Sequence, residues 1–156
     1  MQKPPPKEDL VAKLEQFAQH LADVLKKTGS DWRANSDEGE WSLTEVVCHL
    51  RDVEREVHQA RIAAIIQQDE PFLPGVVTDA WVEKRRYNEQ HGTHALHAFV
   101  VARGETVELL ASLDDRMWGR WGQHAFLGST SLHELVYLIV QHDEAHWQQL
   151  IRLLAA

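Results

Sequence analysis

The residues in this sequence that are best suited to metal binding or catalysis are its histidines. The chain has ten histidines among 156 residues, and His142 and His146 lie four residues apart near its end. Residues four apart lie one turn above each other on a helix, so both imidazoles can address one point. The spacing is typical of a metal chelate, because both ring nitrogens reach ~2.0–2.1 Å from one ion without backbone strain. It equally fits two histidines at the core edge that bond to the backbone or to Asp143 and Glu144.

A third histidine favours the metal interpretation. His49 belongs to another predicted helix, on or beside its apolar stripe. Two ligands from one helix and one from another form a three-histidine site that leaves positions open for water or substrate, which suits an enzyme better than a structural ion. Asp52 and Glu56 follow on the same helix, roughly 60° and 20° around it from His49. They are close enough to orient an imidazole or relay a proton, although solvated charges are the commoner outcome on a helix flank.

The remaining histidines are weaker candidates. Three repeat every third residue but straddle an expected helix break, so we interpret them as exposed: His91, His94 and His97. Three others lie among polar neighbours and are expected to be solvated: His20, His58 and His133. His124 belongs to a segment rich in glycine and tryptophan and stays open as a residue that lines a cleft.

Cysteine and tryptophan are weaker candidates for a functional site. Cys48 and His49 are neighbours on a helix and point about 100° apart, so they do not form a nucleophile and base, and we expect a buried, inert thiol. One cysteine cannot form an internal disulfide, so the chain needs no oxidising compartment and is expected to be cytoplasmic. Four tryptophans lie near helix ends, where they pack in the core or wall an apolar pocket: Trp41, Trp118, Trp121 and Trp147.

The spacing of apolar residues predicts four long helices, at about 9–27, 43–68, 94–113 and 135–154. Capping boxes begin the second and the last, at Ser42 with Glu45 and at Ser131 with Glu134. A shorter charged helix is expected over 79–91 and a structured loop over 114–130. No alternating run predicts a strand. We therefore predict an all-α four-helix bundle with long loops between helices, in which 1–8 is an N-terminal tail and 9–156 is the domain.

The amino-acid composition restricts the classes of partner that the chain can bind. Sixteen Lys and Arg against 24 Asp and Glu give a net charge of −8. This charge disfavours binding to nucleic acid. The N-terminus does not resemble a signal peptide, and no stretch approaches the roughly 18 apolar residues of a membrane span. We expect a small-molecule substrate and no partner in membrane or nucleic acid.

Two segments resemble the DinB/YfiT-like superfamily. The first runs from Glu40 to Leu50 and continues through Asp52 and Glu54, and the second runs from 124 to 146 and ends in an HDxxH element. The stretches 85–90 and 99–103 also match, so the resemblance covers about 10–154. It implies a four-helix bundle that binds a divalent metal through three histidines, which map onto His49, His142 and His146. The superfamily includes bacillithiol-dependent S-transferases and a mycothiol-dependent maleylpyruvate isomerase. Its bundles often pair as homodimers, so the resemblance also implies a homodimer for this chain.

These observations leave three functional hypotheses. The first is a metalloenzyme with Zn, Ni or Fe, either an S-transferase that uses a low-molecular-weight thiol or a hydrolase that activates water, with Asp143, Asp52 or Glu56 as assisting groups. The second is a metal-binding or stress-response protein without catalysis, in which the ion ties the helices together. The third is a bundle without metal, whose histidines are satisfied core residues.

Overall fold

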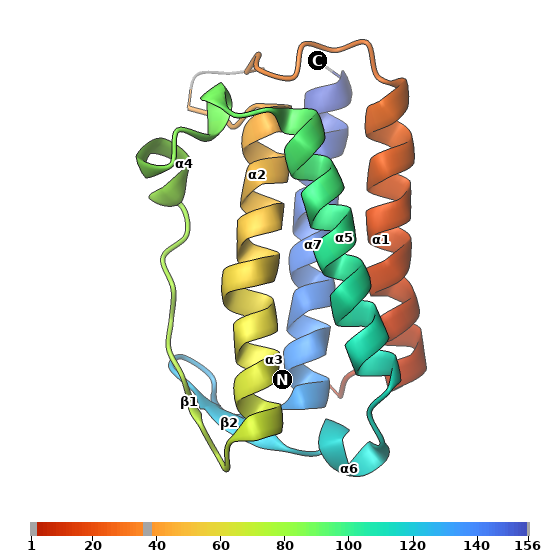
Figure 1. Ribbon diagram of the computed structural model, residues 1–156, viewed down its shortest axis with the longest axis vertical. Helices are drawn as coiled ribbons and strands as arrows, with labels where there is room; N and C mark the ends of the chain where they lie inside the picture. Colours follow the sequence, from red (N-terminus) through yellow and green to blue (C-terminus); the bar gives the residue numbers. More distant parts are fainter. Residues whose placement is uncertain (1–2, 36–38, 156) are drawn as a thin grey trace.

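The computed structural model describes residues 3–35 and 39–155. Four long helical segments lie side by side and form the predicted all-α four-helix bundle (Figure 1). These are α1 (Lys7–Lys27), the continuous run of α2 (Leu43–Val53), the π-helical turn η1 (Glu54–His58) and α3 (Gln59–Gln67), then α5 (Gly92–Ala111) and α7 (Leu132–Ala155). Helix α1 begins after Pro6, two residues before the expected Asp9.

Both predicted capping boxes are present. Ser42 accepts from the Glu45 amide and its own amide donates to the Glu45 carboxylate, and Ser131 and Glu134 repeat this exchange at the start of α7. The boxes satisfy backbone donors that a helix start otherwise leaves without partners. They fix the first residues of the two helices that carry the candidate metal ligands.

The shorter segments differ from the predictions. The helix expected over 79–91 is reduced to α4 (Trp81–Lys84) and the 3-10 turn η2 (Tyr87–Glu89), because Arg86 between them has a left-handed backbone, with φ of 52°, that ends an α-helix. The segment expected as a loop over 114–130 contains α6 (Asp115–Trp118), β2 (Trp121–His124) and most of β3 (Gly128–Ser131).

A small sheet covers one end of the bundle. Strand β1 (Phe72–Leu73) pairs parallel to β2, and β2 pairs antiparallel to β3. The expectation that no strand would form was therefore wrong, although the sheet is minor. Two- and four-residue strands are too short for the alternation that reveals a strand in sequence. Gly122 also lets β2 approach β1 closely, since a Cβ there would lie 2.9 Å from the Pro71 carbonyl oxygen.

The core consists of two apolar clusters. One surrounds Phe99 and Tyr87 between α1, α2 and α5, and the other surrounds Ile65 and Ile139 between α1, α3 and α7. The apolar stripe of α1 contributes to both clusters, since Leu10 and Leu14 belong to the second and Leu21 and Leu25 to the first. The helices therefore pack over their full length without contributions from the candidate metal ligands.

A buried group of charges lies between the four helices. The Arg103 guanidinium donates to the Glu54 carboxylate at 3.0 Å and to the Asp143 carboxylate at 2.7 and 2.9 Å, and it also donates to the Leu14 carbonyl at 3.1 Å. Arg103 is only 1% exposed, and Glu54 and Asp143 are buried with it. Burial raises the pKa of Asp143 to about 6, even with Arg103 beside it. One cation thus connects α1, η1, α5 and α7.

Replacing this cation is expected to destabilise the fold. Arg103→Met leaves two buried carboxylates without a counter-charge, which should cost about 3–5 kcal/mol of unfolding free energy. Urea denaturation followed by circular dichroism measures this loss. The matched control is Arg55→Met on η1, because Arg55 is exposed. Adding Glu54→Gln and Asp143→Asn to Arg103→Met should recover part of the loss, and a loss below about 1 kcal/mol would contradict the assignment.

Candidate metal centre

The structure brings the three predicted metal ligands together between α2 and α7. The Nε2 atom of His146 lies 3.1 Å from Nε2 of His49 and 3.1 Å from Nε2 of His142. One ligand atom from each histidine falls within 4.8 Å of the others. Among the residues that the structure describes, no further His, Cys, Asp or Glu joins this group. The arrangement offers three nitrogens to one ion and leaves any other coordination position to water or substrate.

The spacing of these nitrogens fits a divalent ion. Two nitrogens at ~2.0–2.1 Å from a tetrahedral ion lie about 3.3–3.4 Å apart, close to the distances observed. Nδ1 of His146 lies 2.8 Å from Oε1 of Gln149, which is an acceptor, so the ring proton is on Nδ1 and Nε2 presents a lone pair. Nε2 of His49 and Nε2 of His142 each lie 3.1 Å from Nε2 of His146, and they cannot both donate a hydrogen bond to its single lone pair. A shared cation satisfies all three nitrogens at once.

Burial keeps the three rings neutral. It lowers the pKa of His49 to about 3 and that of His142 to about 2, and it also lowers the pKa of His146. The neighbouring imidazoles act in the same direction on His49 and His142. Neutral imidazole is the form that binds metal, so no proton has to leave these rings at pH 7.

Trp41 forms one wall of the centre. Its ring lies nearly parallel to that of His146 at a centroid distance of 6.4 Å, and 4.9 Å from the ring of His49. The other three tryptophans lie elsewhere: Trp118 is buried against His133, Trp121 is on β2, and Trp147 packs against Phe17. Of the four tryptophans considered from sequence, only Trp41 contacts a candidate ligand.

His58 was expected to be solvated, and this prediction was wrong. The side chain is buried, and its ring packs edge-on against the ring of His142 at a centroid distance of 5.3 Å. The π-helical turn that ends at His58 explains the difference, because a wider turn rotates the following residues relative to regular α-helical spacing. Polar neighbours in the sequence, on which the prediction rested, do not reveal such a turn.

The carboxylates of α2 and η1 do not reach the imidazoles. Asp52 accepts from Arg51 at 2.8 Å, from Arg85 at 2.9 Å and from the Tyr87 hydroxyl at 2.6 Å, and these donors hold its pKa below the usual range against the effect of burial. Glu56 pairs with the same Arg85. The suggestion that Asp52 or Glu56 orients an imidazole was therefore wrong.

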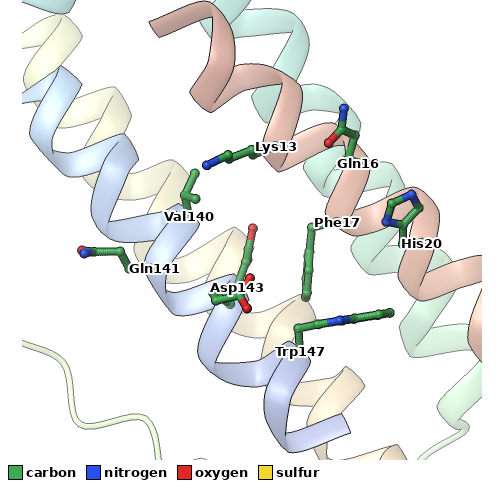
Figure 2. Close-up of a pocket in the computed structure, with 9 residues that line it drawn as sticks. Lys13, Gln16, Phe17, His20, Val140, Gln141, Asp143 and Trp147 are labelled. Carbon is green, nitrogen blue, oxygen red and sulfur yellow. The ribbon is translucent and has the colours of Figure 1, made fainter. Parts of the chain in front are cut away.

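Asp143 also points away from the three histidines. It is bound to Arg103 and lines a groove of about 460 Å³ between α1 and α7 (Figure 2). Adjacent helical residues point about 100° apart, so His142 and Asp143 address different sides of α7. The groove contains Phe17 and Trp147 but none of the three candidate ligands. Because Asp143 is bound to Arg103, it does not accept from an imidazole. In the described part of the chain, Nδ1 of His49 and Nδ1 of His142 are both without a hydrogen-bond partner.

The other side chains considered from sequence agree with the expectations in most respects. Burial raises the pKa of the Cys48 thiol to about 11, so this side chain is inert. His20, His91, His94 and His97 are exposed. His133 is partly buried, with Nε2 at 2.7 Å from the Pro5 carbonyl oxygen. His124 is buried on β2, and its Nδ1 accepts from the amides of Phe126 and Leu127.

Comparison with known proteins identifies the family and supports the fold. The family model of the DinB superfamily matches residues 9–150. The chain belongs to the DinB superfamily. A solved structure of YfiT from Bacillus subtilis, described as a probable metal-dependent hydrolase with an unusual four-helix bundle topology, is 20% identical in sequence with a TM-score of 0.84. The match covers 98% of this DinB-superfamily chain and 89% of that one, and at this identity it supports the fold.

No curated protein matches this member of the DinB superfamily. Within the described residues, none of the helices has the length and apolar character required to cross a membrane.

Metal content tests the centre directly. Protein purified without a histidine tag is expected to bind about one divalent ion per chain, and His49→Ala and His142→Ala should each remove most of it, because two nitrogens hold an ion far less well than three. Elemental analysis after dialysis measures the occupancy. His94→Ala is the control, since His94 is exposed on α5. A wild-type protein that neither contains nor takes up a divalent ion would contradict the assignment.

Proposed function

We propose that this chain is a divalent-metal-dependent hydrolase that acts on a small molecule. The proposal depends on one observation, the convergence of three neutral Nε2 atoms without a fourth protein ligand among the described residues. Catalytic sites differ from structural ones in this open position. The similarity in fold to YfiT, itself described as a probable metal-dependent hydrolase, supports the choice of reaction class.

The three histidines would hold the ion, for which Zn, Ni or Fe suits an all-imidazole donor set. When bound, such an ion supplies Lewis acidity, which polarises a substrate oxygen and lowers the pKa of a water. Trp41 covers one face of His49 and His146 and excludes bulk water from that side. Gln149 fixes the tautomer and orientation of His146 through its 2.8 Å contact with Nδ1.

A purely structural ion is less consistent with the packing. Both apolar clusters and the Arg103 group hold the helices together without the three histidines. Classical structural metal sites replace a core that the chain is too small to build. We therefore expect chelation to remove the ion and leave the helical spectrum and most of the stability unchanged.

An S-transferase is the alternative reaction. The buried Cys48, whose pKa is about 11, does not supply a nucleophilic sulfur, so a transfer reaction requires a bound low-molecular-weight thiol. Hydrolysis requires only water. The two reactions differ in whether turnover depends on added thiol.

The test measures turnover of uncharged chromogenic substrates by the metal-loaded protein. We expect hydrolysis of 4-nitrophenyl acetate without thiol, a loss of at least about 100-fold on chelation or in His49→Ala, and recovery when the metal returns to the wild type. His94→Ala should behave as the wild type. Parallel reactions with bacillithiol, mycothiol or glutathione and an electrophile test the transferase: turnover only in their presence overturns hydrolysis. Metal-loaded protein that turns over neither class of substrate would exclude both reactions.

A further inference from the structure

Arg61 on α3 is a partly buried cation without a carboxylate partner. Its Nη2 donates to the Pro74 carbonyl at 2.9 Å, while its Nε is buried and has no hydrogen-bond partner. Among the described residues, the other arginines that are partly or fully buried each contact a carboxylate: Arg51, Arg85, Arg103 and Arg120. Burial lowers the pKa of Arg61, and no nearby acid opposes this effect. A partly buried cation without a counter-charge is stabilised when an anion binds beside it, and a ligand can provide that anion.

The position of Arg61 relates it to the metal centre. It follows His58 by three residues on one helical run, so the two side chains lie on the same face of the helix. His58 in turn packs its ring against the candidate ligand His142. Arg61 also lies beside the small sheet, since its Nη2 donates at 2.9 Å to the carbonyl of Pro74, the residue that follows β1. Arg61 is therefore about one turn beyond the residue that touches the centre.

His124 offers a second donor to the same region. Its Nδ1 accepts the amide hydrogens of Phe126 at 3.1 Å and Leu127 at 3.3 Å, so the proton of the neutral ring is on Nε2. In the described part of the chain, this Nε2–H has no protein acceptor. His124 pairs with Leu73 in the sheet, next to Pro74, whose carbonyl accepts from Arg61. Two hydrogen-bond donors without acceptors thus belong to neighbouring elements.

A small apolar hollow adjoins Arg61. It has a volume of about 100 Å³, and its walls are mostly apolar, including Val57, Ala60, Phe72 and Val76. Glu56 also lines it, but that carboxylate is bound to Arg85. Walls of this kind suit a short hydrocarbon chain, and one guanidinium among them suits a single negative charge better than the double charge of phosphate.

We propose that Arg61, assisted by the Nε2–H of His124, binds the carboxylate of a substrate whose short apolar chain occupies the hollow. The substrate class is then a short-chain carboxylate that also bears the bond to be cleaved. This inference rests on the proposed hydrolase function and names its substrate. Arg61 acts as a positioning and specificity residue, because it holds the anionic end while the three histidines face the scissile group.

Binding measurements test the carboxylate site without relying on turnover. Calorimetry with the whole, metal-loaded chain compares butanoate with butanamide, which has the same chain without the charge, and with inorganic phosphate. We expect butanoate to bind at least about tenfold more tightly than either, as one charge-assisted hydrogen bond provides. Equal binding of butanoate and butanamide, tighter binding of phosphate, or no binding of butanoate would overturn the proposal.

Variants separate Arg61 from direct binding of carboxylate to the metal. Arg61→Gln should weaken butanoate at least about tenfold, and Arg61→Lys, which keeps the charge, should weaken it less. Arg55→Gln, on the exposed side of the same helical run, should have no effect. Circular dichroism and metal content identify any variant that has lost its fold or its ion. An unchanged butanoate affinity in folded, metal-loaded Arg61→Gln would overturn the proposal.

The two proposals fail in different ways. A wild type that binds butanoate through Arg61 but hydrolyses no neutral ester would retain the carboxylate site and lose the hydrolase function. A wild type that hydrolyses neutral esters while Arg61→Gln leaves butanoate binding unchanged would retain the hydrolase and lose the carboxylate site. If both hold, Arg61→Gln should raise KM for monoethyl succinate at least about tenfold and leave KM for diethyl succinate unchanged.

Discussion

The buried guanidinium of Arg103 is the interaction on which the arrangement of the metal centre depends. It joins Glu54, the first residue of the π-helical turn, to Asp143, the neighbour of His142 on α7. Buried charges tolerate little displacement, because moving one partner away leaves an unpaired charge in a medium of low polarity. The pairing therefore fixes how far α2 and α7 can slide past each other. The 3.1 Å spacing of the imidazole nitrogens requires this restriction.

The centre itself contributes little to the stability of the fold. Nδ1 of His49 and of His142 is buried without a partner, and both imidazoles are desolvated. Such groups cost free energy, which the two apolar clusters offset. Local arrangements that oppose stability are expected at functional sites, where binding of the ligand or ion supplies the missing interactions.

The charge around the centre differs from the charge of the whole chain. The chain carries a net charge of −8, but the buried acids Asp52, Glu54 and Asp143 are bound to arginine. Burial lowers the pKa of His146, and the exposed Asp79 is the acid whose charge opposes this effect. Arg61 on α3, in contrast, has no carboxylate partner among the described residues. Under the proposal made for Arg61, this cation would receive an anionic group in a chain that is acidic overall. This difference arises from pairing in three dimensions and is invisible in a count of charges.

The sequence alone determined the four helices, the two capping boxes and the three histidines that converge. These depend on short-range patterns: apolar spacing, cap residues within one turn, and an i, i+4 histidine pair. Tertiary structure alone decided the surroundings of His58, Asp52, Asp143 and Arg61. No residue type in the sequence predicts the π-helical turn, which rotates the side chains that follow it. Whether an acid or an arginine is paired depends on which side chains pack against it in the folded protein. Long-range pairing also created the small sheet, because strands of two to four residues exist only where a neighbouring strand completes their hydrogen bonds.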